Sequence, residues 1–148
     1  MAKQKQKKIK QLSIEVKAKR NTEIEVPQCY SFCFKYLTGN KNYCLDYFTK
    51  NCHDTVYIIG QAFKKMAEVG NMSTTEFDSI SNRKVKETLP KSVFKYEICE
   101  KMPESYPNTQ FIILRFNGQN CRMVLKRNKS VLHVIGFDFD FTLYNHGE

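Results

Sequence analysis

The sequence lacks any long apolar run. None of its 148 residues falls in a stretch that approaches the ~18 consecutive apolar residues of a membrane-spanning helix. The first residues are basic rather than apolar, which is unlike a secretory signal. We therefore expect a cytoplasmic protein without a membrane partner, and the length fits one domain or one domain with a tail.

Closely spaced cysteine pairs are also missing. The chain has six cysteines but no Cys-x-x-Cys motif, and reduced thiols are the default for a cytosolic protein. Cys52 and His53, with Cys44 nearby, come nearest to a zinc site, but four ligands at the usual spacings are missing. The sequence therefore predicts neither a metal ion nor another cofactor.

Acidic residues are scarce in two parts of the chain. Residues 1–20 carry eight Lys or Arg and one Glu, and residues 83–130 carry eleven basic and four acidic side chains, within a net charge of +9. Two basic regions suggest a polyanionic partner, RNA or the ribosome. The alternative is a solvated surface plus a flexible tail. We expect a basic, flexible tail over residues 1–20 and a single domain over residues 21–148.

Helical spacing marks the middle of the chain. Apolar residues recur at the period of an amphipathic helix over residues 55–69, with Asp54 before them as the N-cap and Gly70 just after them. The apolar stripe comprises Val56, Ile59, Ala62, Phe63, Met66 and Ala67. Ser73-Thr-Thr-Glu76 has the capping-box pattern and predicts a second, short helix that ends near Ser81.

Alternation of apolar and polar residues predicts the strands. It occurs in residues 12–19, 29–37 and 92–99, and the last third of the chain reads as a three-stranded meander over residues 110–116, 119–127 and 131–141. Asn117-Gly118 suits the first turn of the meander. Residues 82–86 read as a basic connector. The expected fold is α+β, with two helices packed on a mostly antiparallel sheet that ends in the meander.

The final strand carries Asp138 and Asp140 on the face opposite three phenylalanines. This Asp-x-Asp-x-Thr segment resembles the first motif of the haloacid-dehalogenase phosphatases, in which the first aspartate is a nucleophile beside magnesium. In that family the motif ends the first strand of a doubly wound domain, whereas here eight residues follow Asp140. We therefore favour pairing of the two aspartates with Arg115, Arg122 or Arg127.

Short motifs near the C-terminus are similar to those of the RelE-like toxin superfamily. They are Arg122-Met-Val-Leu-Lys126, then Val131-Leu-His-Val134 after a turn, then Tyr144-Asn-His146. Members are small mRNA interferases, and many act on the ribosome. The resemblance implies a metal-independent endoribonuclease with a cognate antitoxin protein as partner. The region with Ser-Thr-Thr-Glu-Phe77 and Asn-Arg-Lys84 also resembles small proteins carried by bacterial mobile elements.

Under that resemblance, four residues are candidate catalytic groups. RNA cleavage by the 2′-hydroxyl needs a base, an acid and cations that stabilise the additional negative charge. Arg83 and Arg122 would stabilise charge, and Tyr144 and His146 would transfer protons. Nucleic-acid contacts are assigned to Lys84, Lys86, Arg115, Lys126 and Arg127. His133 alternates with apolar neighbours and is interpreted as a core histidine.

A second hypothesis is a non-catalytic factor of a phage or mobile element that binds nucleic acid or protein. Its basic tail would hold nucleic acid electrostatically, with strong salt dependence. The nuclease hypothesis and the binding-factor hypothesis predict different surface features. A nuclease needs Arg122 and either Tyr144 or His146 around one phosphate in a cationic cleft, whereas a binding factor should expose an apolar or aromatic patch.

Overall fold

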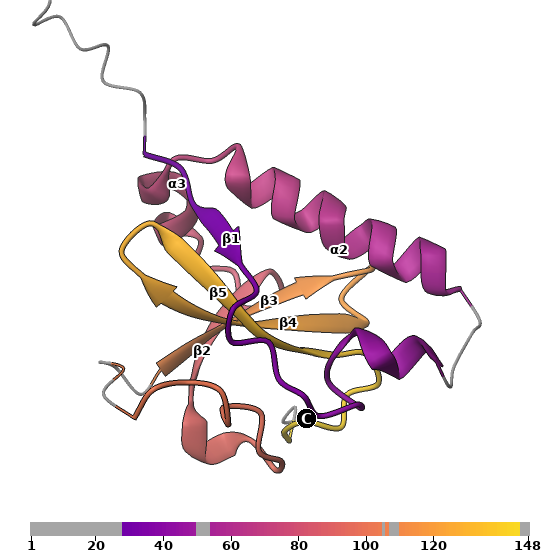
Figure 1. Ribbon diagram of the computed structural model, residues 1–148. Helices are drawn as coiled ribbons and strands as arrows, with labels where there is room; N and C mark the ends of the chain where they lie inside the picture. Colours follow the sequence, from indigo (N-terminus) through magenta and orange to yellow (C-terminus); the bar gives the residue numbers. More distant parts are fainter. Residues whose placement is uncertain (1–27, 50–53, 105, 107–109, 146–148) are drawn as a thin grey trace, which may run out of the picture.

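A five-stranded mixed sheet is the centre of the fold (Figure 1). The computed structural model describes residues 28–49, 54–104, 106 and 110–145. The strands lie in the order β1-β5-β4-β3-β2. They are β1 (Ser31–Cys33), β2 (Lys86–Pro90), β3 (Gln110–Phe116), β4 (Cys121–Asn128) and β5 (Val131–Asp138). β3, β4 and β5 form the predicted antiparallel meander, β2 adds antiparallel to β3, and β1 adds parallel to β5.

Two helices pack on one face of this sheet, so the predicted α+β class is confirmed (Figure 1). They are α2 (Thr55–Gly70) and the short α3 (Thr74–Ser79). Two 3-10 helices, η1 (Leu45–Thr49) and η2 (Lys91–Val93), lie outside the sheet. In the part of the chain that the structure describes, no helix is long and apolar enough to cross a membrane.

The predicted helix ends agree closely with the structure. The Ser73 hydroxyl accepts a hydrogen bond from the Glu76 N–H, and the Glu76 carboxylate accepts one from the Ser73 N–H, so the predicted capping box is present. Asp54 does precede α2, but its backbone is left-handed and its side chain makes no capping hydrogen bond. Gly70 is the last residue of α2 rather than the first beyond it.

Each face of the sheet has its own hydrophobic core. The core beneath the helices contains Tyr30, Ala62, Val69, Phe77, Leu114, Phe116, Met123, Leu125, Leu132, Val134, Phe137 and Phe139, among others. The core on the opposite face contains Tyr43, Ile98, Phe111, Ile113, Val124, Ile135, Leu143 and Tyr144, among others. Alternation along β3 and β4 supplies side chains to both cores, because successive residues of a strand point to opposite faces.

The turn between β3 and β4 follows the Asn-Gly prediction in its conformation. Asn117, Gly118 and Gln119 have φ values of 50°, 59° and 75°, and the Asn120 N–H donates to the Asn117 carbonyl over 3.0 Å. Positive φ at both central residues is the geometry that matches the twist of a hairpin. The second strand nevertheless begins at Cys121 rather than at Gln119.

β5 contains a bulge that fits it to the segment after β1. Val124 pairs with Gly136 and Leu125 with Val134, so Ile135 is the extra residue. The Thr38 N–H donates to the Ile135 carbonyl and the Phe137 N–H to the Tyr43 carbonyl, both over 2.8 Å. The edge of β5 is thus covered first by β1 and then by residues 38–43.

The predicted strand over residues 131–141 ends at Asp138, and two other predicted strands differ more widely from the structure. The alternating segment 29–37 forms only the three-residue β1, because the chain turns after Cys33, where the Leu37 N–H bonds to the Phe34 carbonyl. The segment 92–99 is not a strand; β2 is formed instead by residues 86–90, which overlap the predicted connector. β2 is an edge strand that ends at Pro90, a position where a missing N–H costs no ladder bond. The predicted strand at 12–19 lies outside the described residues.

The helix α2 is rotated relative to the predicted stripe. Ala62 is buried as expected, and Ile59 and Met66 pack against the helix-side core. Val56 and Phe63 are instead 87% and 61% exposed, and Ala67 is exposed with them. Part of the predicted apolar stripe therefore faces away from the sheet.

Candidate nucleic-acid interface

Two hollows on the helix-covered side of the sheet contain four of the five residues assigned to nucleic-acid contacts. The polar pocket, with a volume of about 340 Å³, is lined by Asp78, Lys86, Thr88, Gln110, Ile112 and Arg127. The basic groove, with a volume of about 240 Å³, is lined by Gln61, Lys64, Lys65, Glu68, Lys84, Val85, Arg115, Phe116, Asn117, Gly118 and Gln119. The first lies at the start of β3 and the second at its end.

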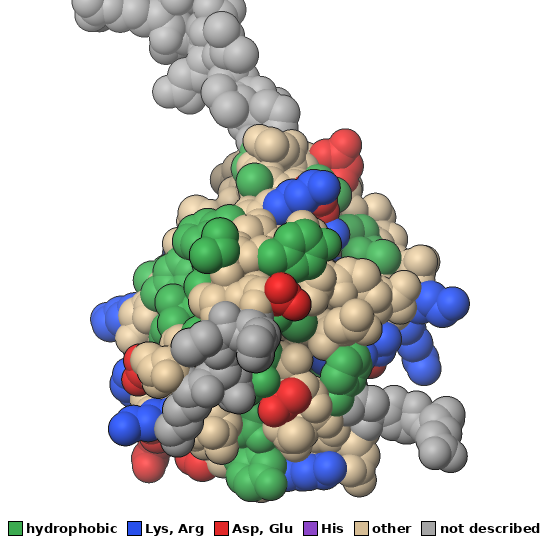
Figure 2. Space-filling model, turned by 90° about the vertical axis from the view of Figure 1, so that its right-hand side faces the viewer, with side chains coloured by type: hydrophobic (Ala, Val, Ile, Leu, Met, Phe, Trp, Pro, Cys, Tyr) green, Lys and Arg blue, Asp and Glu red, His purple; other side chains and the backbone are tan. Residues whose placement is uncertain are grey.

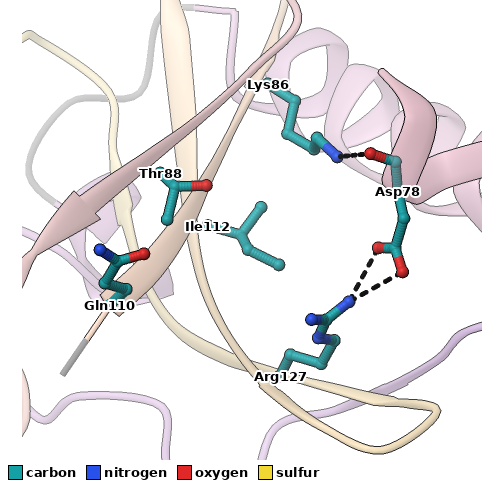
Figure 3. A pocket seen from close by; sticks show the side chains of 6 residues that line it. All are labelled: Asp78, Lys86, Thr88, Gln110, Ile112 and Arg127. Carbon is teal, nitrogen blue, oxygen red and sulfur yellow. Dashed lines mark hydrogen bonds and ion pairs between the residues drawn. The ribbon is translucent and has the colours of Figure 1, made fainter. Parts of the chain in front are cut away.

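In the polar pocket, Lys86 is held by the end of a helix. Its Nζ atom donates to the carbonyl oxygen of Phe77 over 2.7 Å, at the C-terminus of α3. It also donates to the carbonyl oxygen of Asp78 over 3.2 Å (Figure 3). The Nζ atom also lies 4.7 Å from the centre of the Phe77 ring. Burial lowers the pKa of Lys86. Lys86 therefore stabilises the α3–β2 junction, since a cation near a helix C-terminus is favourable.

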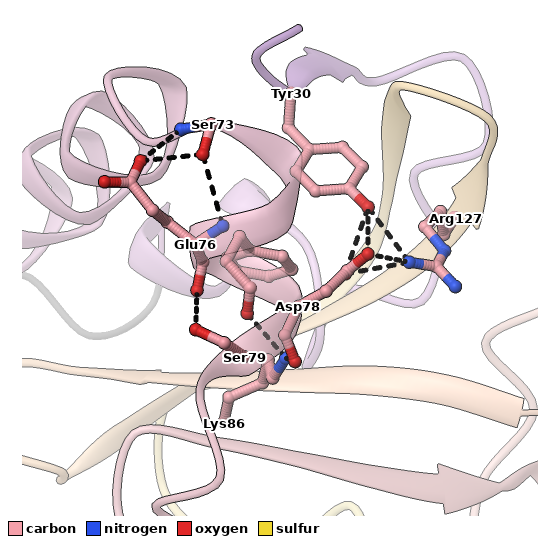
Figure 4. Close-up of polar contacts among 8 residues, drawn as sticks. Tyr30, Ser73, Glu76, Asp78, Ser79, Lys86 and Arg127 are labelled. Carbon is pink, nitrogen blue, oxygen red and sulfur yellow. Dashed lines mark hydrogen bonds and ion pairs between the residues drawn. The ribbon is translucent and has the colours of Figure 1, made fainter. Parts of the chain in front are cut away.

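Arg127, like Lys86, already makes hydrogen bonds to other groups of the protein. Its Nη1 atom donates to both oxygens of the Asp78 carboxylate, over 2.8 Å and 2.9 Å, and to the Tyr30 hydroxyl over 2.9 Å (Figure 4). The Tyr30 hydroxyl in turn donates to Asp78 over 3.1 Å. The hydrogen bond to Tyr30 and the charge of Asp78 raise the pKa of Arg127. Asp78 therefore offsets part of the positive charge of the polar pocket.

The basic groove has more uncommitted charge. Lys64 and Lys65 come from α2, Lys84 from the loop before β2, and Arg115 from β3. Lys65 pairs with Glu68, the one carboxylate that lines the groove. Among the described residues, neither Lys64 nor Lys84 has an ion-pair partner, and both are exposed.

Arg115 closes the groove at the edge of the sheet. Its Nη2 atom donates to Glu87 Oε1 over 3.1 Å. Its Nε atom is buried and has no hydrogen-bond partner among the described residues. A buried donor without a partner costs free energy. Arg115 thus lines the groove from β3, but its guanidinium is bound to Glu87 on the face of the sheet that carries Arg122.

Two predicted catalytic residues, Arg122 and Tyr144, come together on the opposite face of the sheet. Arg122 lies near the Tyr144 hydroxyl, and its positive charge acts to lower the pKa of Tyr144; both residues are only 3% exposed. Arg122 also donates to the Gln119 carbonyl over 2.7 Å, lies 4.1 Å from the centre of the Phe141 ring and is directly opposite Asp138 in the strand register.

Tyr144 is fixed by a carboxylate as well. Its hydroxyl donates to Glu87 Oε1 over 2.9 Å, and burial followed by this hydrogen bond raises its pKa strongly. The hydroxyl therefore keeps its proton near neutral pH. Arg83 is exposed in the loop before β2, and no described interaction links it to Arg122 or Tyr144. His146 lies outside the described residues.

Lys126 does not lie in either hollow. It is 1% exposed, its Nζ atom donates to the Gln110 carbonyl over 2.8 Å, and it lies 4.7 Å from the centre of the Phe111 ring. Burial lowers its pKa. The assignment of Lys126 to a nucleic-acid contact thus conflicts with its burial in the core opposite the helices.

The two C-terminal aspartates are acceptors for the chain that follows them. Asp138 accepts the N–H groups of Thr142 and Leu143 over 3.0 Å and 3.3 Å. Asp140 accepts the Thr142 hydroxyl over 3.0 Å. Of the three predicted arginine partners, Arg115 pairs with Glu87, Arg127 with Asp78, and Arg122 alone faces Asp138.

Metal ligands do not cluster in the described part of the chain, where no group of three His, Cys, Asp or Glu side chains could hold an ion. Cys52 and His53 lie outside that part. Burial raises the pKa of Cys99 to about 11, so this thiol is not a reactive thiolate near neutral pH.

The sequence interpretation missed several residues of the two hollows. Lys64 and Lys65 belong to the predicted helix over residues 55–69. The spacing of residues along the sequence does not show that they lie beside the basic segment at residues 83–86 in space. Glu87 and Thr88 lay in no predicted element. A protein-family comparison, a comparison with curated proteins and a comparison with solved structures each give no match to this chain.

Proposed function

We propose that this protein is a non-catalytic nucleic-acid-binding factor and that single-stranded RNA lies along the basic groove. The observation that carries the proposal is the convergence of Lys64, Lys65 and Lys84 on one groove with a single lining carboxylate. These three cations come from two segments of the chain, α2 and the loop before β2. A cluster of this kind is the electrostatic footprint of a phosphate-binding surface.

A phosphate binds best to cations that make few hydrogen bonds or ion pairs within the protein. Arg127 and Lys86 in the polar pocket already bond to Asp78, to Tyr30 and to helix carbonyls. Lys64 and Lys84 in the basic groove are exposed and have no ion-pair partner among the described residues. A phosphate at the basic groove therefore displaces fewer interactions within the protein. The net charge of +7 in residues 1–20 adds a second source of attraction.

A binding titration with a labelled single-stranded RNA tests the proposal. The double variant Lys64→Ala with Lys84→Ala should bind more weakly than the wild type. Its plot of log affinity against log salt concentration should be less steep by about 1.4, since each lost phosphate contact on a single strand removes about 0.7 from the slope. Fluorescence anisotropy over a range of salt concentrations measures both quantities.

The matched control is Lys91→Ala with Lys95→Ala, which removes the same charge from exposed positions on the other side of the sheet. We expect the control to lower the affinity much less than the groove variant. Equal losses in the two variants would mean that net charge alone governs binding, and the groove would then have no special role.

The second candidate is a RelE-like metal-independent endoribonuclease that cleaves mRNA. The observation that favours it is the contact between Arg122 and Tyr144, two residues separated by the whole of β5. Their burial and the commitment of Tyr144 to Glu87 count against it. Incubation of the same RNA with the protein in a chelator tests this candidate. Cleavage that is lost in Tyr144→Phe would favour the nuclease over the binding factor.

A further inference from the structure

The outer face of α2 is apolar along its whole length. Val56, Gly60, Phe63 and Ala67 are spaced at steps of four, three and four residues, which places them on one stripe of the helix. All four are exposed. Figure 2 looks onto the side of the molecule where α2 begins and shows hydrophobic side chains at the surface there. A contiguous apolar surface of this kind is typical of an interaction site.

Packing among the described residues does not account for this stripe. The opposite side of α2 faces the sheet, where Ala62 and Val69 are buried. Apart from Gly60 itself, its two chain neighbours and the nearby backbone of the helix, no described atom lies within 4 Å of the position that a Cβ would take at Gly60. A glycine inside a helix costs about 1 kcal/mol relative to alanine. Nothing in the described fold requires that cost, so the open notch at Gly60 points to a contact outside the single chain.

The stripe is complementary to a second copy of itself. When two α2 helices lie antiparallel about a two-fold axis between residues 61 and 62, position 60 faces position 63 of the other copy, and position 56 faces position 67. Phe63 then lies over Gly60, and Val56 lies over Ala67. The axis repeats both pairs, so every large side chain of the stripe meets a small one.

The surface beside the stripe has the composition of an interface. On one side, the exposed Phe34 and Leu45 join Ile59 and Phe63 around a small apolar hollow. On the other side lie Tyr57, which is 59% exposed, and the exposed Lys64. An apolar centre with an aromatic and polar margin is the usual arrangement of homodimer interfaces.

We propose that two copies of this protein associate through the outer face of α2, with the helices antiparallel and Phe63 of each copy packed over Gly60 of the other. The occupant of this surface is thus a second copy of the chain. The proposed dimer surface adjoins the basic groove at Lys64, but the inference does not depend on the RNA-binding proposal.

Exchange of charges across the axis tests both the dimer and its register. Val56→Glu and Ala67→Lys should each weaken the dimer at least about tenfold, because each buries an unpaired charge at the contact. The double variant should restore the dimer, since the carboxylate at position 56 then faces the ammonium at position 67 of the other copy. Within one helix these positions are ~16 Å apart, which is too far for an ion pair. Sedimentation velocity of the full chain measures the dimer, and circular dichroism checks the folding of each variant.

The matched control is Tyr96→Gln, which removes another exposed aromatic, 52% exposed, that packs beside Tyr43 on the other face of the sheet. This variant should remain as dimeric as the wild type. A wild-type chain that is monomeric up to its solubility limit would overturn the proposal. Single variants that leave the dimer intact, or a folded double variant that stays monomeric, would overturn the antiparallel α2 contact.

Discussion

At the scale of single residues, Glu87 connects parts of the chain that are far apart in sequence. One oxygen of its carboxylate accepts hydrogen bonds from the Arg115 guanidinium and from the Tyr144 hydroxyl, over 3.1 Å and 2.9 Å. This carboxylate holds β2, β3 and the C-terminal segment together. A carboxylate that is half-shielded from water and hydrogen-bonded to a cation gains more than an exposed ion pair would. Tyr144 thus has a structural role that its position near the C-terminus does not reveal.

His133 gives the fold a dependence on pH. Burial, followed by the charge of Lys35, lowers the pKa of His133 below its ordinary value of 6.5. As the pH falls below about 6.5, the unfolded chain therefore binds a proton at this position before the folded protein does. The contribution of His133 to folding stability is complete above that pH and is lost progressively toward the lower pKa of the folded state.

The variant His133→Gln removes this titration. We expect its free energy of unfolding to fall less than that of the wild type when the pH is lowered from neutral to about 5. Urea unfolding at several pH values measures the difference. If the free energies of unfolding of the two proteins fell in parallel with pH, His133 would not be responsible for the acid sensitivity in this range. The carboxylates would then be its source.

At the scale of elements, Gly60 in α2 and Gly136 in β5 differ in the space available for an added side chain. Gly60 lies inside α2 with open space around it, whereas an added Cβ at Gly136 would lie 3.1 Å from the Tyr43 carbonyl oxygen. We expect Gly60→Ala to raise the stability of the monomer by about 1 kcal/mol through helix propensity. Gly136→Ala should lower it by about 1–3 kcal/mol, since β5 and residues 38–43 must separate.

Thermal and urea unfolding at low protein concentration measure both changes in the monomer. The β5 bulge explains why only one of the two sites is sensitive, because the bulge brings Gly136 against the segment that follows β1. Equal effects of the two substitutions would contradict the close approach of these two backbone segments.

The strand β2 shows how an element can be missed by pattern alone. Lys86-Glu-Thr-Leu-Pro90 has no clear alternation, yet it pairs over five residues with β3. Segment 92–99 has the better alternation but lies outside the sheet, where Ile98 is buried in the second core and Tyr96 is exposed. Edge strands carry weak patterns because only part of each face is buried.

At the scale of the whole molecule, the two faces of the sheet differ in their cover and in their charge. Helices cover one face, and the two hollows with most of the predicted basic residues lie on that side. Loops cover the other face, where Arg122 and Lys126 are buried within the second core. The basic side chains of residues 83–130 are thus divided between the two hollows and the interior of the protein.

This division predicts two separable sources of RNA affinity. Removal of residues 1–20 takes away a net charge of +7 and should lower both the affinity and the salt dependence of binding. The double variant Lys64→Ala with Lys84→Ala should add its own loss to that of the truncation, since distant and independent sites contribute additively. A truncated protein that no longer responds to the groove variant would place all binding in the N-terminal residues. Titration of the four proteins at matched salt concentrations distinguishes these results.

Local rules in the sequence by themselves determined the positions of both helices, the capping box at Ser73 and Glu76, and the turn-linked meander. Each depends on neighbours within a few residues, so spacing alone is sufficient. The grouping of Arg122 with Tyr144 as candidate catalytic residues came instead from the resemblance to the RelE-like toxins. That resemblance could not tell that both would be buried.

Tertiary structure decided which side of α2 faces the sheet, which segment became β2 and which cations remain free. Each depends on a partner far away in the chain: the sheet core selects Ala62 and Val69 over Val56 and Phe63, and Asp78 takes Arg127 out of the basic surface. Hydrophobic burial is non-directional and depends on total apolar area. A helix with apolar residues on two sides can therefore bury either one, and only the complete set of contacts selects between them.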